Sequence, residues 1–163
     1  MEHLTISMWS LVLLVAVALA FDFMNGFHDG ANSISTIVAT GALTPKQAVA
    51  FAAFFNFAAL WIFELKVAAT IGKGTVDPGL VDHYVIFGAL MGALAWNIIT
   101  WYYGIPSSSS HALVGGLVGA TVIKAGDMSP IVWSGFGKIL AFIVISPLVG
   151  FLIGGFLMVA VAW

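Results

Sequence analysis

Two clusters of polar side chains interrupt an otherwise apolar chain, and their residue types suggest ion and anion binding. The first cluster, residues 22–36, contains Asp22, Asn25, His28, Asp29, Asn32, Ser33, Ser35 and Thr36. Polar groups within apolar segments are costly unless they are hydrogen-bonded or used. This cluster indicates an ion or substrate site at the start of a helix. The alternative is an interfacial loop in which Asp29 or Asn32 caps that helix.

The second cluster, residues 106–111, reads Pro-Ser-Ser-Ser-Ser-His. Pro106 disfavours helix for the residue before it, which leaves Ser107 to Ser110 near the N-terminus of the next helix. Four hydroxyls, free backbone N–H groups and the positive end of a helix dipole together suit an anion. The alternative is a serine-rich cap beside a tight helix crossing, because Gly115 and Gly119 form a small-residue packing pattern.

If the two clusters face each other, they form one site with carboxylate, amide and hydroxyl groups but no arginine and no embedded lysine. An anion beside Asp29 would be repelled unless a cation or proton entered with it. We therefore expect a cation- or proton-coupled oxyanion carrier rather than an anion pore lined by basic rings. His28 and His111 are candidate proton relays because imidazole titrates near neutral pH, although a lone histidine is more often structural.

The composition places these clusters in a membrane. Of 163 residues, 61% are hydrophobic and 7% are charged, against about 25% charged in soluble domains. We expect one transmembrane domain, residues 1–163, that crosses the cell membrane several times in contact with the lipid bilayer. A net charge of −2 and no arginine argue against nucleic-acid binding. Zero cysteines exclude thiolate chemistry, and we expect no cofactor and no firm metal site.

Apolar segments predict the helices. Residues 4–24, 45–69, 81–103 and 131–163 are long enough to span a bilayer, and Pro147 is expected to kink the last. Residues 30–42 and 110–124 are too short to span, and each follows a polar cluster. The sequence thus predicts an all-α helical bundle with two short broken or re-entrant helices, a device by which transporters build substrate sites.

At these clusters the chain resembles the PiT family of inorganic phosphate transporters. Residues 26–32, Gly-Phe-His-Asp-Gly-Ala-Asn, resemble the signature Gly-Ala-Asn-Asp-x-Ala-Asn, with Asp29 and Asn32 on its Asp and last Asn. Residues 106–111 resemble Pro-x-Ser-Thr-Thr-His, with Ser at both Thr positions. His28 stands where many members have Asn, and the bacterial low-affinity members carry the Phe-His-Asp form.

The resemblance implies an inverted-repeat transporter in which each repeat gives one copy of the signatures to a central phosphate site. The residues expected to contact phosphate or coupling ions are Asp29, Asn32, Ser108, Ser109 and Ser110. The group expected to take part in cation coupling is Gly26 and Phe27, through their backbones, with His28, Asp29 and Asn32. Because the chain holds one copy of each motif, we expect a second half or a second copy to complete the site.

The expected function is therefore phosphate symport with Na⁺ or H⁺, with phosphate carried free or as a metal complex. A non-transporting membrane subunit and a carrier of another tetrahedral oxyanion are the alternatives. We do not expect an enzyme. A hydrolase using Ser110 and His111 is disfavoured, because adjacent side chains on a helix point in different directions and no Gly-x-Ser-x-Gly elbow is present.

Overall fold

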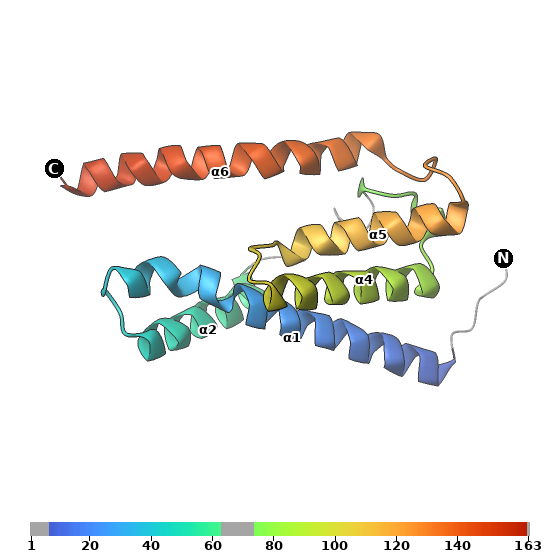
Figure 1. Ribbon diagram of the computed structural model, residues 1–163, viewed down its shortest axis with the longest axis horizontal. Coiled ribbons are helices and arrows are strands. Elements are labelled where there is room, and N and C mark those ends of the chain that lie inside the picture. Colours follow the sequence, from blue (N-terminus) through green and yellow to red (C-terminus); the bar gives the residue numbers. More distant parts are fainter. Residues whose placement is uncertain (1–6, 63–73, 163) are drawn as a thin grey trace.

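The computed structural model describes residues 7–62 and 74–162, which are mostly helical (Figure 1). The helices are α1 (Met8–Ala39), α2 (Pro45–Ile62), α4 (His83–Tyr102), α5 (Ser109–Ala125) and α6 (Trp133–Ala162), with the 3-10 turn η1 (Pro78–Leu80) before α4. Among these described helices, α1, α4 and α6 are long and apolar enough to cross a bilayer. The predicted all-α membrane protein is confirmed.

Three of the four predicted spans correspond to these long helices. The fourth predicted span, residues 45–69, begins with α2. The part of this prediction beyond Ile62 lies outside the described residues. α2 turns back after α1 through residues 40–44, where both the backbone N–H and the hydroxyl of Thr44 donate to Gln47 Oε1. The two helices therefore form a helical hairpin.

Helix α1 runs for 32 residues and passes through the first polar cluster without interruption. The separate short helix predicted for residues 30–42 is therefore wrong, because this segment is the C-terminal part of α1. No proline occurs between Met8 and Ala39, and neither Gly26 nor Gly30 has a positive φ. Nothing forces the backbone out of the helix, so Asp29 and its neighbours lie inside α1, about two thirds of the way along it, rather than at a helix start.

The second short helix is confirmed as α5, which has 17 residues. Ser108 precedes it as the N-cap, in an extended conformation that follows Pro106. Gly126 ends it with φ +82°, a left-handed conformation that glycine adopts without a steric penalty. At ~1.5 Å per residue α5 is ~26 Å long, slightly less than a ~30 Å hydrocarbon core.

α4 and α5 run antiparallel and approach closely at glycines. A Cβ atom on Gly116 would overlap the carbonyl oxygen of Ala89, and one on Gly88 would lie 3.4 Å from the Ala120 methyl. Because the contacts Ala89–Gly116 and Gly88–Ala120 fix the register, residues nearer the C-terminus of α4 lie opposite the beginning of α5. The second polar cluster therefore stands beside the last turns of α4.

α1 packs against the same pair and runs parallel to α4 (Figure 1). Phe21 is buried against Leu90 and Ala93 of α4, and Ala112 and Leu113 of α5 pack on this cluster. α1, α4 and α5 thus share an apolar contact that precedes the polar residues His28 on α1 and Asn97 on α4 and follows Ser109 on α5.

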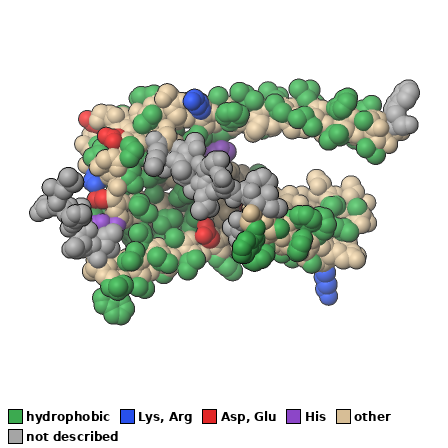
Figure 2. Space-filling model, turned by 180° about the vertical axis from the view of Figure 1, so that it is seen from behind, with side chains coloured by type: hydrophobic (Ala, Val, Ile, Leu, Met, Phe, Trp, Pro, Cys, Tyr) green, Lys and Arg blue, Asp and Glu red, His purple; other side chains and the backbone are tan. Residues whose placement is uncertain are grey.

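α6 is fixed at its beginning and exposed along the rest of its length. The Val132 N–H donates to the Thr75 carbonyl at 3.0 Å, and the Asp77 N–H donates to the Pro130 carbonyl at 2.8 Å. None of its residues is buried, and hydrophobic side chains cover it (Figure 2). Pro147 lies inside the helix, which continues to Ala162. Such an apolar surface fits lipid or a further protein segment.

Replacing Gly116 with alanine is expected to destabilise the protein, because the new methyl group would overlap the Ala89 carbonyl. Overpacking of this kind costs about 1–3 kcal/mol. Gly115→Ala is the matched control, since a Cβ there meets no atom within 4 Å and alanine favours helix. Thermal unfolding in detergent should give a lower midpoint for Gly116→Ala than for Gly115→Ala. Equal midpoints would contradict the close α4–α5 contact.

Candidate functional site

His28 anchors the first cluster inside the helix bundle. Its side chain is 7% exposed, and its Nε2 lies 3.3 Å from the hydroxyl oxygen of Thr100 on α4. The Thr100 hydroxyl donates to the Trp96 carbonyl at 2.8 Å, so its oxygen is left to accept a hydrogen bond from Nε2–H. A neutral His28 then presents an unprotonated Nδ1, which lies 3.5 Å from a carboxylate oxygen of Asp29.

Asp29 and Asn32 lie on the outer side of α1. The Asp29 side chain is 41% exposed, and its Oδ1 accepts a hydrogen bond from Asn32 Nδ2 at 3.4 Å. The structure therefore joins His28, Asp29 and Asn32 into one polar group. Their role in coupling stays a prediction.

Gly26 and Phe27 have no polar side chain, so only their backbone carbonyls could bind a cation. Gly26 has open space where a side chain would lie, and the Phe27 ring packs 5.5 Å from the Trp101 ring of α4. Within a continuous helix, each carbonyl accepts from the N–H group four residues later, which leaves one lone pair for a cation. Cation binding by these two backbones also stays a prediction.

The serine cluster stands at the N-terminus of α5, as predicted. Ser107 accepts a hydrogen bond from Trp96 Nε1 at 3.0 Å, and the Ser108 hydroxyl accepts from the His111 N–H at 3.4 Å. Ser109 is 1% exposed, and its hydroxyl has no hydrogen-bond partner among the described residues. Ser110 and His111 are exposed at the helix surface.

A buried polar layer lies where α1, α4 and α5 meet. Asn97 of α4 is fully buried, and neither its side-chain N nor its side-chain O has a partner within residues 7–62 and 74–162. The α4–α5 register places Asn97 opposite Ser109, and Thr100, one turn further along α4, meets His28. An asparagine within an apolar span predicts an interhelical hydrogen bond, and the described residues provide none for Asn97. Its unpaired amide marks it as a candidate site residue, because buried polar groups rarely stay unpaired without a role.

The two clusters meet through α4 rather than directly. No hydrogen bond or ion pair in the described part of the chain joins Asp29 or Asn32 to Ser108, Ser109 or Ser110. The connection runs from His28 to Thr100 and, by register, from Asn97 to Ser109.

Two cavities open beside the serine cluster. One, of about 400 Å³, is lined by Trp96, Ser107, Ser108 and His111 together with glycines of α4 and α5. The other, of about 550 Å³, lies between α5 and α6 and is lined by Ser110 and His111 on one wall. His111 therefore faces both cavities, which suits the predicted proton relay but does not test it.

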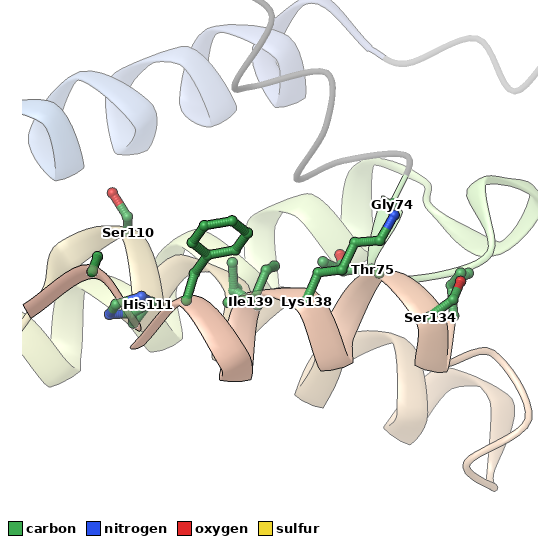
Figure 3. A pocket seen from close by; sticks show the side chains of 12 residues that line it. Gly74, Thr75, Ser110, His111, Ser134, Lys138 and Ile139 are labelled. Atoms are coloured by element: carbon green, nitrogen blue, oxygen red, sulfur yellow. The ribbon is translucent and has the colours of Figure 1, made fainter. Parts of the chain in front are cut away.

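The cavity between α5 and α6 is lined by one lysine that the sequence analysis did not identify as a site residue. Lys138 of α6 lines it together with Ser134, Ser110 and His111 (Figure 3). The signal available in the sequence was the position of Lys138 four residues after Ser134 on an apolar helix. Without the packing of α6, nothing indicated that this face turns toward α5.

An ion pair joins α4 and α5 at the end of the helix pair that is opposite the serine cluster. Lys124 Nζ lies 2.7 Å from Asp82 Oδ2, and Asp82 Oδ1 caps α4 by accepting from the Val85 N–H at 3.0 Å. The hydrogen bonds from Lys124 and from the Val85 N–H lower the pKa of Asp82 below its ordinary value. Because a carboxyl with a lowered pKa is stabilising only while ionised, its contribution is present at neutral pH and lost on acidification.

Substitutions at Asp82 should separate the charge from the cap. Asp82→Asn keeps an N-capping side chain but loses the ion pair, whereas Asp82→Ala loses both and should cost about 1 kcal/mol more. In thermal unfolding at pH 7, the midpoints should fall in the order wild type, Asn, Ala. The gap between wild type and Asp82→Asn should close as the pH falls below 3.8, the ordinary pKa of an aspartate side chain. A gap that widens on acidification would contradict the assigned ion pair.

Comparison with known proteins identifies the class. The profile of the phosphate transporter family matches residues 25–163. The chain belongs to this family, as its two motifs predicted. No solved structure matches the chain.

Three relatives are named probable low-affinity inorganic phosphate transporters. The chain is 59% identical over 153 residues to that of Rhizobium meliloti (strain 1021), covering 94% of this chain and 46% of the relative. It is 49% identical over 145 residues to that of Bacillus subtilis (strain 168), covering 88% and 43%. It is 45% identical over 155 residues to that of Streptomyces halstedii, covering 93% and 71%. The chain thus spans less than half the length of the first two relatives.

Proposed function

We propose that this chain provides one repeat of a multi-pass carrier that moves inorganic phosphate across the cell membrane together with Na⁺ or H⁺. The observation that carries the proposal is the Ser109 hydroxyl, which is buried at the N-terminus of α5 and has no hydrogen-bond partner within residues 7–62 and 74–162. A buried donor at a helix N-terminus suits an anion. The names of the relatives support phosphate as that anion. We propose transport and not hydrolysis.

Phosphate would bind to Ser108, Ser109 and Ser110 and to the free N–H groups of the first turn of α5. The helix dipole adds roughly +0.5 of an elementary charge there. The Asn97 amide, which has no partner among the described side chains, lies opposite Ser109 by register and can donate to the same anion. Neutral donors would replace the hydration shell of phosphate without fixing a permanent positive charge beside it.

The coupling ion would enter at His28 and Asp29. If the Thr100 hydroxyl donates to Trp96, His28 holds its proton on Nε2, and its bare Nδ1 lies 3.5 Å from the Asp29 carboxylate. Two electron-rich atoms so close repel each other unless a proton or a cation lies near both. Filling this position with H⁺ or Na⁺ removes the repulsion and offsets the negative charge that phosphate brings.

The exposure of Asp29 supports a second repeat or a second copy. A carboxylate inside an apolar helix is costly against lipid, yet Asp29 is 41% exposed. We propose that another half of the carrier covers this side of α1 and completes the site. The greater length of the Rhizobium and Bacillus relatives is consistent with this arrangement.

Asp29→Asn should abolish coupled phosphate uptake while the protein still folds, because the amide cannot balance a coupling cation. Asp127→Asn is the control, since Asp127 is an exposed acid in the loop before α6. Labelled-phosphate uptake and thermal unfolding should be measured for both variants. Normal uptake by a well-folded Asp29→Asn protein would sink the assignment.

The function itself is tested by labelled-phosphate uptake into proteoliposomes that hold only this chain. A Na⁺ gradient and then a pH gradient should each be imposed, and we expect one of them to drive uptake through paired copies. No uptake from folded, inserted protein would instead indicate a half-site or a non-transporting subunit. Competition by sulfate stronger than that by unlabelled phosphate would assign the carrier to another oxyanion.

A further inference from the structure

Every hydroxyl or charged side chain of α6 lines the cavity between α5 and α6. The helix contains two serines and one lysine, Ser134, Ser146 and Lys138, among apolar and glycine residues and Pro147. All three line the 550 Å³ cavity, and Phe142 lies between them on the same wall. Steps of four residues keep side chains on one helix face. α6 therefore turns a single polar face toward α5.

The opposite wall of the cavity is the beginning of α5. Ser110 and His111 lie at one end, Ser134 lies toward the other, and Lys138 extends from α6 toward Gly74 (Figure 3). None of the residues lining the cavity is acidic. Lys138 forms no ion pair or hydrogen bond with another described residue, whereas Lys124 is paired with Asp82. The cavity thus holds a positive charge that no side chain among the described residues neutralises.

An unpaired ammonium group on an otherwise apolar helix is costly. Its cost falls when an anion shares the cavity, and the hydroxyl of Ser134, four residues before Lys138 on α6, offers that anion a hydrogen bond. Lys138 and Ser134 are both exposed, so an anion from solution can reach the two side chains. The flexible stem of lysine allows its ammonium group to reach along the cavity.

We infer that Lys138 and Ser134 form a second oxyanion subsite, which captures phosphate on its way to or from the hydroxyls at the N-terminus of α5. This inference rests on the proposed function, because it takes phosphate as the anion. Lys138 acts by drawing phosphate into the cavity, whereas Ser108 and Ser109 hold it at the helix N-terminus.

Chemical protection tests the subsite without requiring transport. The chain contains no cysteine, so Ser134→Cys gives a unique thiol on the cavity wall. Inorganic phosphate, at constant ionic strength, should slow the reaction of this thiol with the uncharged reagent N-ethylmaleimide several-fold. The same thiol in Ser134→Cys/Lys138→Gln should react at a rate that phosphate does not change. Gly137→Cys, which lies in open space, is the control and should be insensitive to phosphate.

Uptake kinetics give a second measurement. Lys138→Gln should raise the KM for phosphate about 10-fold, the loss expected for one charge-assisted hydrogen bond, with little change in maximal rate. Lys138→Arg should restore most of the affinity. Lys46→Gln is the matched control, because Lys46 is an exposed lysine at the start of α2 and lines no cavity described above.

The outcomes separate the subsite from the proposed function. A thiol at residue 134 that phosphate fails to protect, or that detergent chains protect instead, would overturn the subsite even if the wild-type chain transports phosphate. Protection by phosphate in a folded chain that shows no uptake would support the subsite and contradict transport by this chain alone. A wild-type KM in Lys138→Gln together with unprotected thiol would leave Lys138 with no part in phosphate binding.

Discussion

The close approach of α4 and α5 at Gly116 is the contact on which the candidate site depends. With glycine there, the Ala89 backbone can lie directly against α5. The same register places Ser109 opposite Asn97 and buries both. A side chain at residue 116 would separate the helices, and water or lipid could then reach these polar groups. One missing Cβ atom therefore creates the low-dielectric environment in which a few hydroxyl and amide groups bind an ion strongly.

In the proposed site, the groups that favour a positive ion and those that favour a negative ion lie on different helices, α1 and α5. Both of these helices pack against α4. α1 contributes His28 and Asp29, whose arrangement favours a positive ion, and α5 contributes hydroxyl and N–H donors, which favour a negative one. Each ion lowers the electrostatic cost of binding the other, and such coupling is reciprocal. Such a carrier could couple the binding of the two ions without moving a charged side chain of its own. Because Thr100 contacts His28 while Asn97 lies opposite Ser109 by register, α4 would contact the binding positions of both ions in the proposed carrier.

The sequence predicted the composition of the site better than its geometry. The length of α5 and the placement of Ser108 at its N-terminus followed from Pro106 and the adjacent serines, since these signals act locally. The continuity of α1 did not follow, because a dense polar cluster resembles a loop although none of its residues breaks a helix. Lys138 was missed for a different reason. Its importance depends on which face of α6 meets α5, and that is a property of packing between helices far apart in the sequence.

The position of Lys138 also explains why the serine cluster can do without a basic residue. A lysine in direct contact with Ser109 would hold phosphate in a fixed ion pair, and release would then require breaking that pair in an apolar environment. A carrier must bind its substrate and also let it go. A cation on the wall of the neighbouring cavity attracts the anion from the entrance, while neutral donors at the helix N-terminus hold it more weakly. In the proposed carrier, Lys138 of α6 would thus attract phosphate, whereas the N-terminus of α5 would hold it.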